Sequence, residues 1–363
     1  MKLVSIVGAR PQFVKLAPIV EKLKNQHQHL ILHTGQHYDD SMSDSFFRDL
    51  DIPLPDRNLE IGSGPHGQQT GLMIAGIEQF LIESQPDWVV LYGDTNSTLA
   101  GAVAASKLGF RIAHIEAGLR SRNRQMPEET NRVLTDHASD LCLAPTPVAM
   151  ENLKLEGLGA RSVNVGDIMV DGLIRTRTLV AKNPPQLEWD VGSDFVFATF
   201  HRQELMDDSE RLLRLVSELG AFPLPVVLAA HPRLRNRLDK AGMTGNQVGN
   251  LLIRPPLSYL QLITVLGSAK AVVTDSGGLQ KEAYLMRVPC ATVRPETEWV
   301  ETVESGWNRL VWNDLSVLND MGWLEPQGLH DPGIFGDGHS SEKIIAAIEV
   351  ATQEPFFRAA VDS

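Results

Sequence analysis

The chain is poor in cysteine and has no long apolar run. Its 363 residues include two cysteines, Cys142 and Cys290, which lie far apart in apolar contexts and match neither a disulfide framework nor a zinc motif. We expect two buried, reduced thiols, as in a cytoplasmic protein. No stretch approaches the roughly 20 apolar residues of a membrane helix. The opening MKLVSIVGARPQF precedes no small-residue cleavage site, so we predict a buried strand there and no signal peptide.

Positive charge is also in the minority. The chain has 33 Lys and Arg residues against 45 Asp and Glu residues, a net charge of -12. This balance argues against a general surface for nucleic acid or for an anionic membrane. It leaves room for a local basic pocket that binds a phosphorylated ligand.

Short apolar runs rich in β-branched residues alternate with longer helical patterns, which is typical of parallel α/β units. Predicted strands in the first half lie at 2–8, 29–33, 88–92, 111–115 and 141–144, with helices at 11–24, 67–83 and 95–108. The alternation then restarts, with strands at 195–200, 226–230, 251–254, 271–274 and 291–293 and helices at 209–219, 258–266 and 278–286. The pattern predicts an α/β protein with two Rossmann-like domains.

The stretch 176–194 is polar and contains Asn183-Pro184-Pro185, as a linker does. We therefore predict a first domain at 1–175 and a second at 176–340. The remaining segment, 341–363, contains a last helix that could return to the first domain. Doubly wound sheets hold ligands at the carboxyl ends of their strands, so we expect a ligand in a central cleft that both domains face.

One candidate anion site follows the first strand. Arg10 and Pro11 open the next helix, and Lys15 lies one turn into it. A helix N-terminus offers free N–H groups and a positive dipole end, and both cations add charge beside it. A phosphate fits there, although this turn has neither the dinucleotide fingerprint nor the P-loop spacing. The alternative is two solvated cations on a surface helix.

A second candidate follows a strand of the second half. Ser276 can cap a helix or donate to a phosphate, and Gly277 and Gly278 let the backbone approach an oxyanion. Glu282 lies one turn further on, where it can accept both hydroxyls of a ribose. The alternative is a glycine turn with a capping serine. Two anion sites, one in each domain, indicate a nucleotide diphosphate.

Carboxylates follow two neighbouring strands of the first half. Asp94 comes after WVVLYG, Glu116 comes after RIAHI, and Glu128 and Glu129 follow in MPEE. Such groups share one crevice, where their repulsion favours the uptake of a proton by one of them. The cluster suits proton abstraction and delivery at carbon. Asp94 has an alternative role as a helix N-cap, and Glu116 has no comparable structural role.

Two histidines of the second half also follow strands. His201 comes after FVFATF, and His231 comes after VVLAA. Each can bond a phosphate or a sugar hydroxyl, and the alternative is an ordinary satisfied histidine. They lie too far apart in the sequence for a zinc-ligand pair, so we predict no metal.

These residues lie in motifs that resemble the non-hydrolysing UDP-N-acetylglucosamine 2-epimerase family, which has the glycosyltransferase-B fold. The resemblance runs through nearly the whole chain, in the family's order: GARPQFVKLAP, HTGQHYD, YGDTNSTLAGA, HIEAGLRS, MPEETNR, TFHRQE, DSGGLQKEA and RPETEWVE.

The resemblance implies an isomerase of nucleotide-sugar metabolism that works without a metal or redox cofactor. It implies that UDP is eliminated and re-added through a 2-acetamidoglycal, in the supply of cell-surface polysaccharide precursors. It also implies a homodimer. The implied acid/base set is Asp94, Glu116 and Glu128, with His201 assisting. The implied UDP-binding set is Arg10, Lys15, His231, Ser276, Gly277, Gly278 and Glu282.

Three segments depart from the commonest family pattern. Ala9 and Gln12 stand in the opening motif, TEWVE replaces TERPE, and 38–43 lacks glutamines that some members use for a second, activating UDP-sugar. These changes resemble the branch that epimerises UDP-2,3-diacetamido-2,3-dideoxyglucuronic acid. That substrate needs a cation for its carboxylate, and the candidates are Arg120, Arg122 and Arg124. Their alternative role is a solvated run of charge.

Other functions stay open at this stage. The same acids could serve a hydrolysing epimerase that releases N-acetylmannosamine and UDP. A glycosyltransferase of the same architecture would need an acceptor cleft and has no obvious use for the carboxylate cluster. A non-catalytic UDP-sugar sensor would bind without turnover, and the intact acidic set argues against it.

Overall fold

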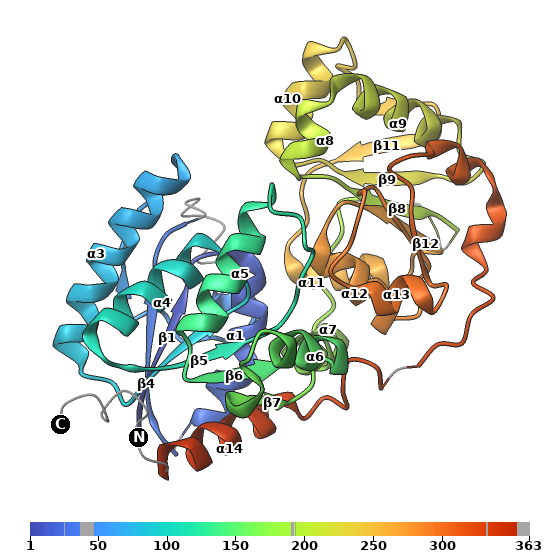
Figure 1. Ribbon diagram of the computed structural model, residues 1–363. Helices are drawn as coiled ribbons and strands as arrows, with labels where there is room; N and C mark the ends of the chain where they lie inside the picture. Colours follow the sequence, from blue (N-terminus) through green and yellow to red (C-terminus); the bar gives the residue numbers. More distant parts are fainter. Residues whose placement is uncertain (25, 37–46, 190–191, 193, 332, 354–363) are drawn as a thin grey trace. The chain divides into compact units, whose positions relative to one another are not determined.

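The computed structural model describes the chain except for residues 25, 37–46, 190–191, 193, 332 and 354–363 (Figure 1). It divides into two compact units, one formed by Met1–Arg175 with Gly333–Ser363 and the other by Thr176–Pro332. The returning segment of the first unit therefore begins before the predicted residue 341. The segment 38–43 lies outside the described residues.

The first unit is built around a seven-stranded sheet in the order β3-β2-β1-β4-β5-β6-β7. All of its strand pairs are parallel. The strands are β1 (Lys2–Val7), β2 (Gln28–His33), β3 (Arg57–Asn58), β4 (Trp88–Tyr92), β5 (Arg111–Ile115), β6 (Leu141–Ala144) and β7 (Ser162–Asn164). The helices are α1 (Arg10–Leu23), α3 (His66–Ser84), α4 (Asn96–Leu108), α5 (Pro127–Ala138), α6 (Pro147–Leu155) and α14 (Ser340–Gln353), and α7 (Ile168–Lys182) begins in this unit and ends in the second.

The second unit repeats this plan, with the strand order β10-β11-β9-β8-β12-β13-β14. Its pairs are parallel except for β10 with β11. The strands are β8 (Val196–Thr199), β9 (Val226–Ala229), β10 (Gln247–Val248), β11 (Leu251–Arg254), β12 (Ala271–Thr274), β13 (Cys290–Thr292) and β14 (Asn308–Leu310). The helices are α8 (Gln203–Asp207), α9 (Ser209–Ala221), α10 (Pro232–Lys240), α11 (Tyr259–Leu266), α12 (Gly277–Leu285) and α13 (Val300–Glu304).

Each sheet reverses its strand order once, and several candidate residues follow the strands at these reversals. Glu116 and His231 instead follow the neighbouring strands β5 and β9. In the first unit β1 lies between β2 and β4, and in the second β8 lies between β9 and β12. The loops after two such neighbouring strands leave in opposite directions and open a crevice at the carboxyl edge of the sheet. The segments after β1, β4, β8 and β12 are therefore placed to hold ligands.

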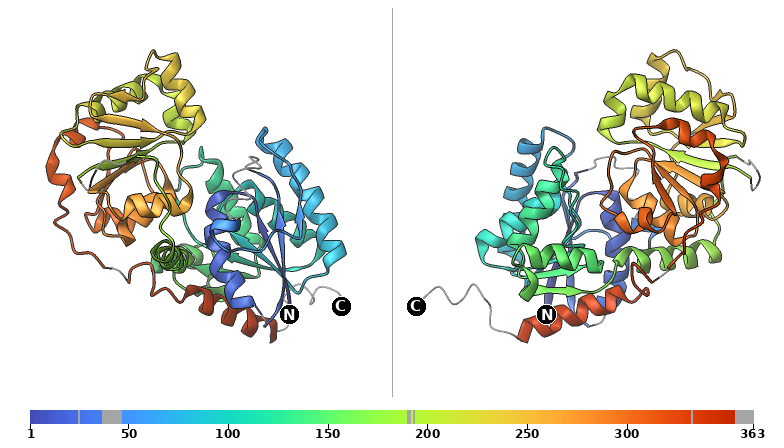
Figure 2. Two further views of the ribbon diagram at one scale, coloured as in Figure 1. Left: turned by 180° about the vertical axis from the view of Figure 1, so that it is seen from behind. Right: turned by 45° about the vertical axis from the view of Figure 1, so that its right-hand side comes forward.

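The last helix, α14, belongs to the first unit, where it lies beside α1 (Figure 2). Lys22 of α1 pairs with Glu342, and the indole N–H of Trp88 donates to the Thr352 hydroxyl at 2.8 Å. The side chains of Ile344 and Ile348 are buried. This helix is thus an integral part of the first unit's packing.

All predicted strands and helices have counterparts with slightly different ends. The predicted linker 176–194 is partly wrong, because α7 continues without a break to Lys182. Several helices, among them α5, α6 and α7, were not predicted. Cys142 and Cys290 are buried as expected, and burial raises the pKa of each thiol to about 12. Among the described helices, none is long and apolar enough to span a membrane.

Candidate functional site

The turn after β1 is fixed by Gln12, one of the residues that depart from the commonest motif. Its side-chain oxygen accepts from the N–H groups of Gly8 and Ala9 at 2.7 and 3.0 Å. Its amide nitrogen donates to the Tyr92 carbonyl at the end of β4, at 2.8 Å. Gln12 therefore joins the two loops at the strand reversal. Arg10 begins α1 directly beside this turn and is partly buried.

Lys15 and Glu116 form a buried ion pair at this edge of the sheet. Their side chains are 9% and 8% exposed, so Lys15 is not a solvated surface cation. The space beside the Gly93 Cα is filled by the same two groups, because a β-carbon there would lie 3.0 Å from Lys15 Nζ and 3.1 Å from Glu116 Oε2. The structure thus brings the residues after β1, β4 and β5 together.

Glu116 has a backbone conformation that few side-chain-bearing residues adopt. Its φ is 72°, in the left-handed region. Its N–H and that of Ala117 both donate to the Leu143 carbonyl of β6, which holds the turn. Strain of this kind costs about 1–3 kcal/mol and is concentrated at functional sites. The backbone therefore supports the catalytic prediction for this residue.

Asp94 is held by a buried arginine that the sequence analysis did not single out. Arg132 donates to Asp94 Oδ2 from Nε at 2.9 Å and from Nη2 at 2.6 Å. Its Nη1 donates to Glu129 at 2.9 Å. The alternative role of Asp94 as a helix cap is wrong, because Thr95 is the N-cap of α4 and accepts from the Thr98 N–H.

Glu128 differs from the other two acids. It lies in the first turn of α5, is partly exposed, and makes no hydrogen bond or ion pair with the rest of the described chain. Asn131 of the same helix donates to the Asp94 carbonyl at 2.9 Å, which fixes α5 beside the end of β4. Asp94 and Glu116 each have a cationic partner, and Glu128 has its carboxylate available.

In the second unit Asp275 organises the crevice, although the sequence analysis gave it no role. Its buried carboxylate accepts from the backbone N–H groups of His201 and Arg202 and lies 3.2 Å from the His201 ring. The loop after β8 is thereby tied to the end of β12. The His201 side chain is 53% exposed, so it can meet a ligand.

The turn after β12 has the form expected of an anion site. Ser276 caps α12 by accepting from the Leu279 N–H. A β-carbon on Gly277 would come within 2.4 Å of Glu298 Oε1, whereas one on Gly278 would meet open space. Free N–H groups at this helix start can therefore be approached by a ligand over Gly278.

Glu282 lies one turn into α12, as predicted, and is 4% exposed. The Tyr259 hydroxyl, which the sequence analysis missed, donates to its Oε1 at 2.7 Å. Burial, together with the neighbouring carboxylate, raises the pKa of Tyr259 well above its usual value. The tyrosine therefore keeps its proton and orients the carboxylate.

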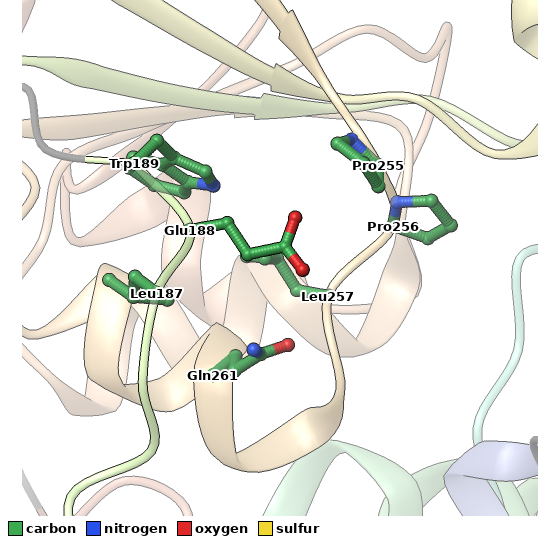
Figure 3. Close-up of a pocket in the computed structure, with 7 residues that line it drawn as sticks. All are labelled: Leu187, Glu188, Trp189, Pro255, Pro256, Leu257 and Gln261. Carbon is green, nitrogen blue, oxygen red and sulfur yellow. The ribbon is translucent and has the colours of Figure 1, made fainter.

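His231 caps α10 at the end of β9 and is exposed. Beside it, a cavity of about 260 Å³ is lined by Ala230, Arg235, Asn246, Ile253, Arg254 and Pro255. A smaller cavity of about 80 Å³ is lined by 255–257 of the β11–α11 loop, by Gln261 of α11 and by 187–189 (Figure 3). Among the described residues, no group of three His, Cys, Asp or Glu side chains could hold a metal ion.

Comparisons with known proteins agree with this arrangement. A family model described as UDP-N-acetylglucosamine 2-epimerase matches residues 21–349. The chain belongs to the UDP-N-acetylglucosamine 2-epimerase family. The expected enzyme class, an epimerase of the isomerase type, is thereby confirmed.

Three relatives of this epimerase cover nearly its whole length. A UDP-N-acetylglucosamine 2-epimerase homolog of Methanococcus maripaludis is 46% identical, over 96% of this chain and 99% of its own. The UDP-2,3-diacetamido-2,3-dideoxy-D-glucuronate 2-epimerase of Pseudomonas aeruginosa is 44% identical, over 95% and 98%. The crystal structure of the Methanocaldococcus jannaschii UDP-GlcNAc 2-epimerase in complex with UDP-GlcNAc and UDP has a TM-score of 0.87 at 38% identity, over 96% and 100%. The expected α/β fold of the glycosyltransferase-B type is confirmed.

Of the three arginines that are candidates for binding a substrate carboxylate in this epimerase, one is excluded. Arg120 is buried and donates to both carboxylate oxygens of Glu156, and it pairs with Asp136 at 2.8 Å. It is therefore committed to the fold and is not available to a substrate carboxylate. Arg122 and Arg124 are exposed and stay candidates.

Proposed function

We propose that this epimerase inverts carbon 2 of a UDP-linked N-acetylated sugar by eliminating and re-adding UDP, without hydrolysis. The observation that supports this most directly is the set of carboxylates at the ends of β4 and β5 and the start of α5. One of them is on a strained turn, and two are paired with cations. A binding protein or a glycosyltransferase has no need of such a set.

In the proposed reaction a carboxylate removes the proton from C2 while the C1–O bond to UDP breaks. A C1=C2 double bond forms, giving a 2-acetamidoglycal and UDP. UDP then adds back to C1 while a proton reaches the opposite face of C2. Asp94, Glu116 and Glu128 supply the acid and the base, and His201 assists at the diphosphate. Because the C2 proton is not beside a carbonyl, stabilisation of the departing diphosphate is part of catalysis.

The proposed nucleotide-binding residues occur in each of the two units. Arg10 and Lys15 contribute charge from the first unit. The start of α12 at Ser276, Gly277 and Gly278 binds phosphate in the second, with His231, and Glu282 accepts the ribose hydroxyls. The Glu282 carboxylate is oriented as an acceptor because Tyr259 donates to one of its oxygens. A nucleoside base fits the cavity beside His231.

Two substrates fit this site, UDP-GlcNAc and the diacetamido glucuronate on which the Pseudomonas relative acts. Trp299, part of the departing TEWVE motif, is buried, and the ammonium of Lys281 lies 3.8 Å from its ring centroid. Trp299, which departs from the commonest family motif, is thus part of the buried packing beside Glu282. We propose a role in supplying cell-surface polysaccharide precursors and a homodimeric enzyme, both from the family resemblance.

Proton NMR in D2O tests the proposed reaction. Incubation with UDP-GlcNAc should introduce deuterium at C2 and produce UDP-ManNAc with little free sugar. Exchange with the diacetamido glucuronate alone would identify that branch. Accumulation of free ManNAc and UDP would favour the hydrolysing reaction. If neither sugar exchanges its C2 proton, the assignment as a C2 epimerase is wrong.

Arg10→Ala is expected to weaken UDP binding by about tenfold to a hundredfold, the effect of losing one charge-assisted hydrogen bond. Isothermal titration with UDP measures the change. Lys24→Ala, which removes an exposed cation just beyond the other end of α1, is the matched control and should bind UDP normally. Unchanged affinity in Arg10→Ala would remove this residue from the nucleotide site.

Gly278→Ala is expected to separate stability from binding. The added methyl meets open space in the protein and favours the helix by about 0.5–1 kcal/mol, so the melting temperature should rise. UDP binding should nevertheless weaken about tenfold, because the methyl occupies the approach to the helix start. Gly71→Ala, on the exposed side of α3, should stabilise without affecting UDP. Normal UDP affinity in Gly278→Ala would contradict the phosphate site.

A further inference from the structure

A buried carboxylate lies behind the turns that carry the catalytic acids and has no part in the reaction as proposed. Asp136 of α5 and His114 of β5 are both 0% exposed. Neither side chain can meet a substrate. Their hydrogen bonds nevertheless run to both turns.

The first set of bonds leads to the turn after β4. His114 Nδ1 lies 2.6 Å from Asp136 Oδ1, and His114 Nε2 lies 2.7 Å from the Gly93 carbonyl oxygen. The ring therefore bridges the Asp136 carboxylate and the Gly93 carbonyl. Gly93 has a φ of 63° and directly precedes Asp94. The imidazole therefore transmits the position of Asp136 to the residue that precedes one catalytic acid.

The second set leads to the turn after β5. Asp136 Oδ2 accepts from the Gly118 N–H at 3.0 Å and pairs with Arg120 Nη1 at 2.8 Å. Gly118 has a φ of 85° and Glu116 has one of 72°, so this turn contains two left-handed residues. A β-carbon on Gly118 would lie 2.4 Å from the Ala149 carbonyl of α6, which shows how closely the turn is packed. Such a conformation persists when its surroundings hold it in place.

Buried ionic groups of this kind contribute little to the net free energy of unfolding. Burial acts to raise the pKa of Asp136, but the hydrogen bond and charge of His114 and the charge of Arg120 outweigh it, and the pKa lies below its usual range. Well-packed apolar residues in place of such a buried ionic network are often as stable or more stable. The network's distinctive property is geometric, because one carboxylate contacts both turns.

We infer that Asp136 is a positioning residue, which sets the Asp94 and Glu116 carboxylates relative to each other through His114 and the Gly118 N–H. This inference rests on the proposed function. Displacing a reacting group by about 1 Å can cost a hundredfold in rate, so the precision of both turns matters for proton transfer at C2.

Asp136→Ala tests the inference, because loss of a positioning residue should lower kcat without weakening the binding of substrate or UDP. We expect kcat for deuterium exchange at C2 to fall about a hundredfold, with KM and the UDP dissociation constant nearly unchanged. Asp136→Asn is the conservative variant. Its amide oxygen can accept from the Gly118 N–H, and its NH2 can donate to His114 Nδ1 when the ring carries its proton on Nε2, so it should recover at least about tenfold of the lost rate.

Asp171→Ala is the matched control. This buried carboxylate of the same unit accepts from the Ser340 and Ser341 N–H groups and from the Ser341 hydroxyl, far from the acids in the sequence. It should lower the melting temperature and leave kcat near that of the wild type at temperatures where it is folded. A wild-type kcat in Asp136→Ala, or an equal loss of kcat in Asp171→Ala, would overturn the inference.

Variants of His114 keep the inference testable if Asp136→Ala does not fold. His114→Gln can place an N–H donor near the Gly93 carbonyl, whereas His114→Asn is too short to reach it. His114→Asn should therefore lose more of the rate, and equal rates would count against the inference. Absence of C2 exchange in the wild type, with both UDP-sugars, would instead show that the proposed function is wrong.

Discussion

Glu116→Gln should lower kcat for C2 epimerisation by about 10²–10⁴-fold, the usual contribution of a positioned acid or base. The amide keeps the size of the side chain and its place beside Lys15, but it cannot take up the C2 proton. UDP binding should stay near normal, because the phosphate site in the second unit is untouched. The measurement is NMR-detected deuterium exchange at C2, together with titration of UDP.

The same substitution leaves a buried ammonium without its counter-charge, so some loss of stability is expected as well. The Lys15 side chain is 9% exposed and cannot be fully hydrated. Glu342→Gln is the control, because it breaks the exposed pair with Lys22 in the same unit and should change neither turnover nor unfolding appreciably. Loss of UDP binding in Glu116→Gln, or a normal exchange rate, would contradict the catalytic role.

Arg132→Leu should cost about 3–5 kcal/mol of unfolding free energy, because it leaves Asp94 and the buried Glu129 without their shared cation. The arginine is 3% exposed, so solvent cannot replace it. Urea unfolding measures the loss. Turnover should fall together with stability, since Asp94 loses the two bonds that orient it.

Arg132→Lys separates the charge of this residue from its geometry. Lysine keeps the positive charge but cannot donate from three nitrogens of one plane to two carboxylates. It should therefore recover most of the stability while kcat stays about tenfold or more below that of the wild type. A fully active Arg132→Lys variant would show that Asp94 needs only a nearby charge.

The arrangement of the core strands could be predicted because each is a short, continuous apolar run. WVVLY and AVVT are buried along their full length, so hydrophobicity alone marks β4 and β12. The signal fails where polar residues make up a helix. PEETNRVLTDHA has no continuous apolar run and was not predicted as a helix, yet it forms α5, because its buried polar side chains bond to the loops around it.

The candidate site shows the same division. Acids that follow strands, such as Asp94 and Glu116, could be located because the carboxyl edge of a parallel sheet gathers them. Arg132, Asp136 and Tyr259 were missed because their importance comes from partners distant in the sequence. Arg120 shows the reverse error, since an arginine in a run of charge reads as exposed and is in fact buried.

The position of α14 has a consequence for how the protein is made. The second unit is a continuous stretch of chain, whereas the first needs residues from both sides of that stretch. On a ribosome the β1–β7 sheet emerges early, yet the face that α14 covers stays open until Ser340–Gln353 has been synthesised. During that interval the side of α1 that packs against α14 is uncovered, so the first unit completes its packing only after the second unit has been synthesised.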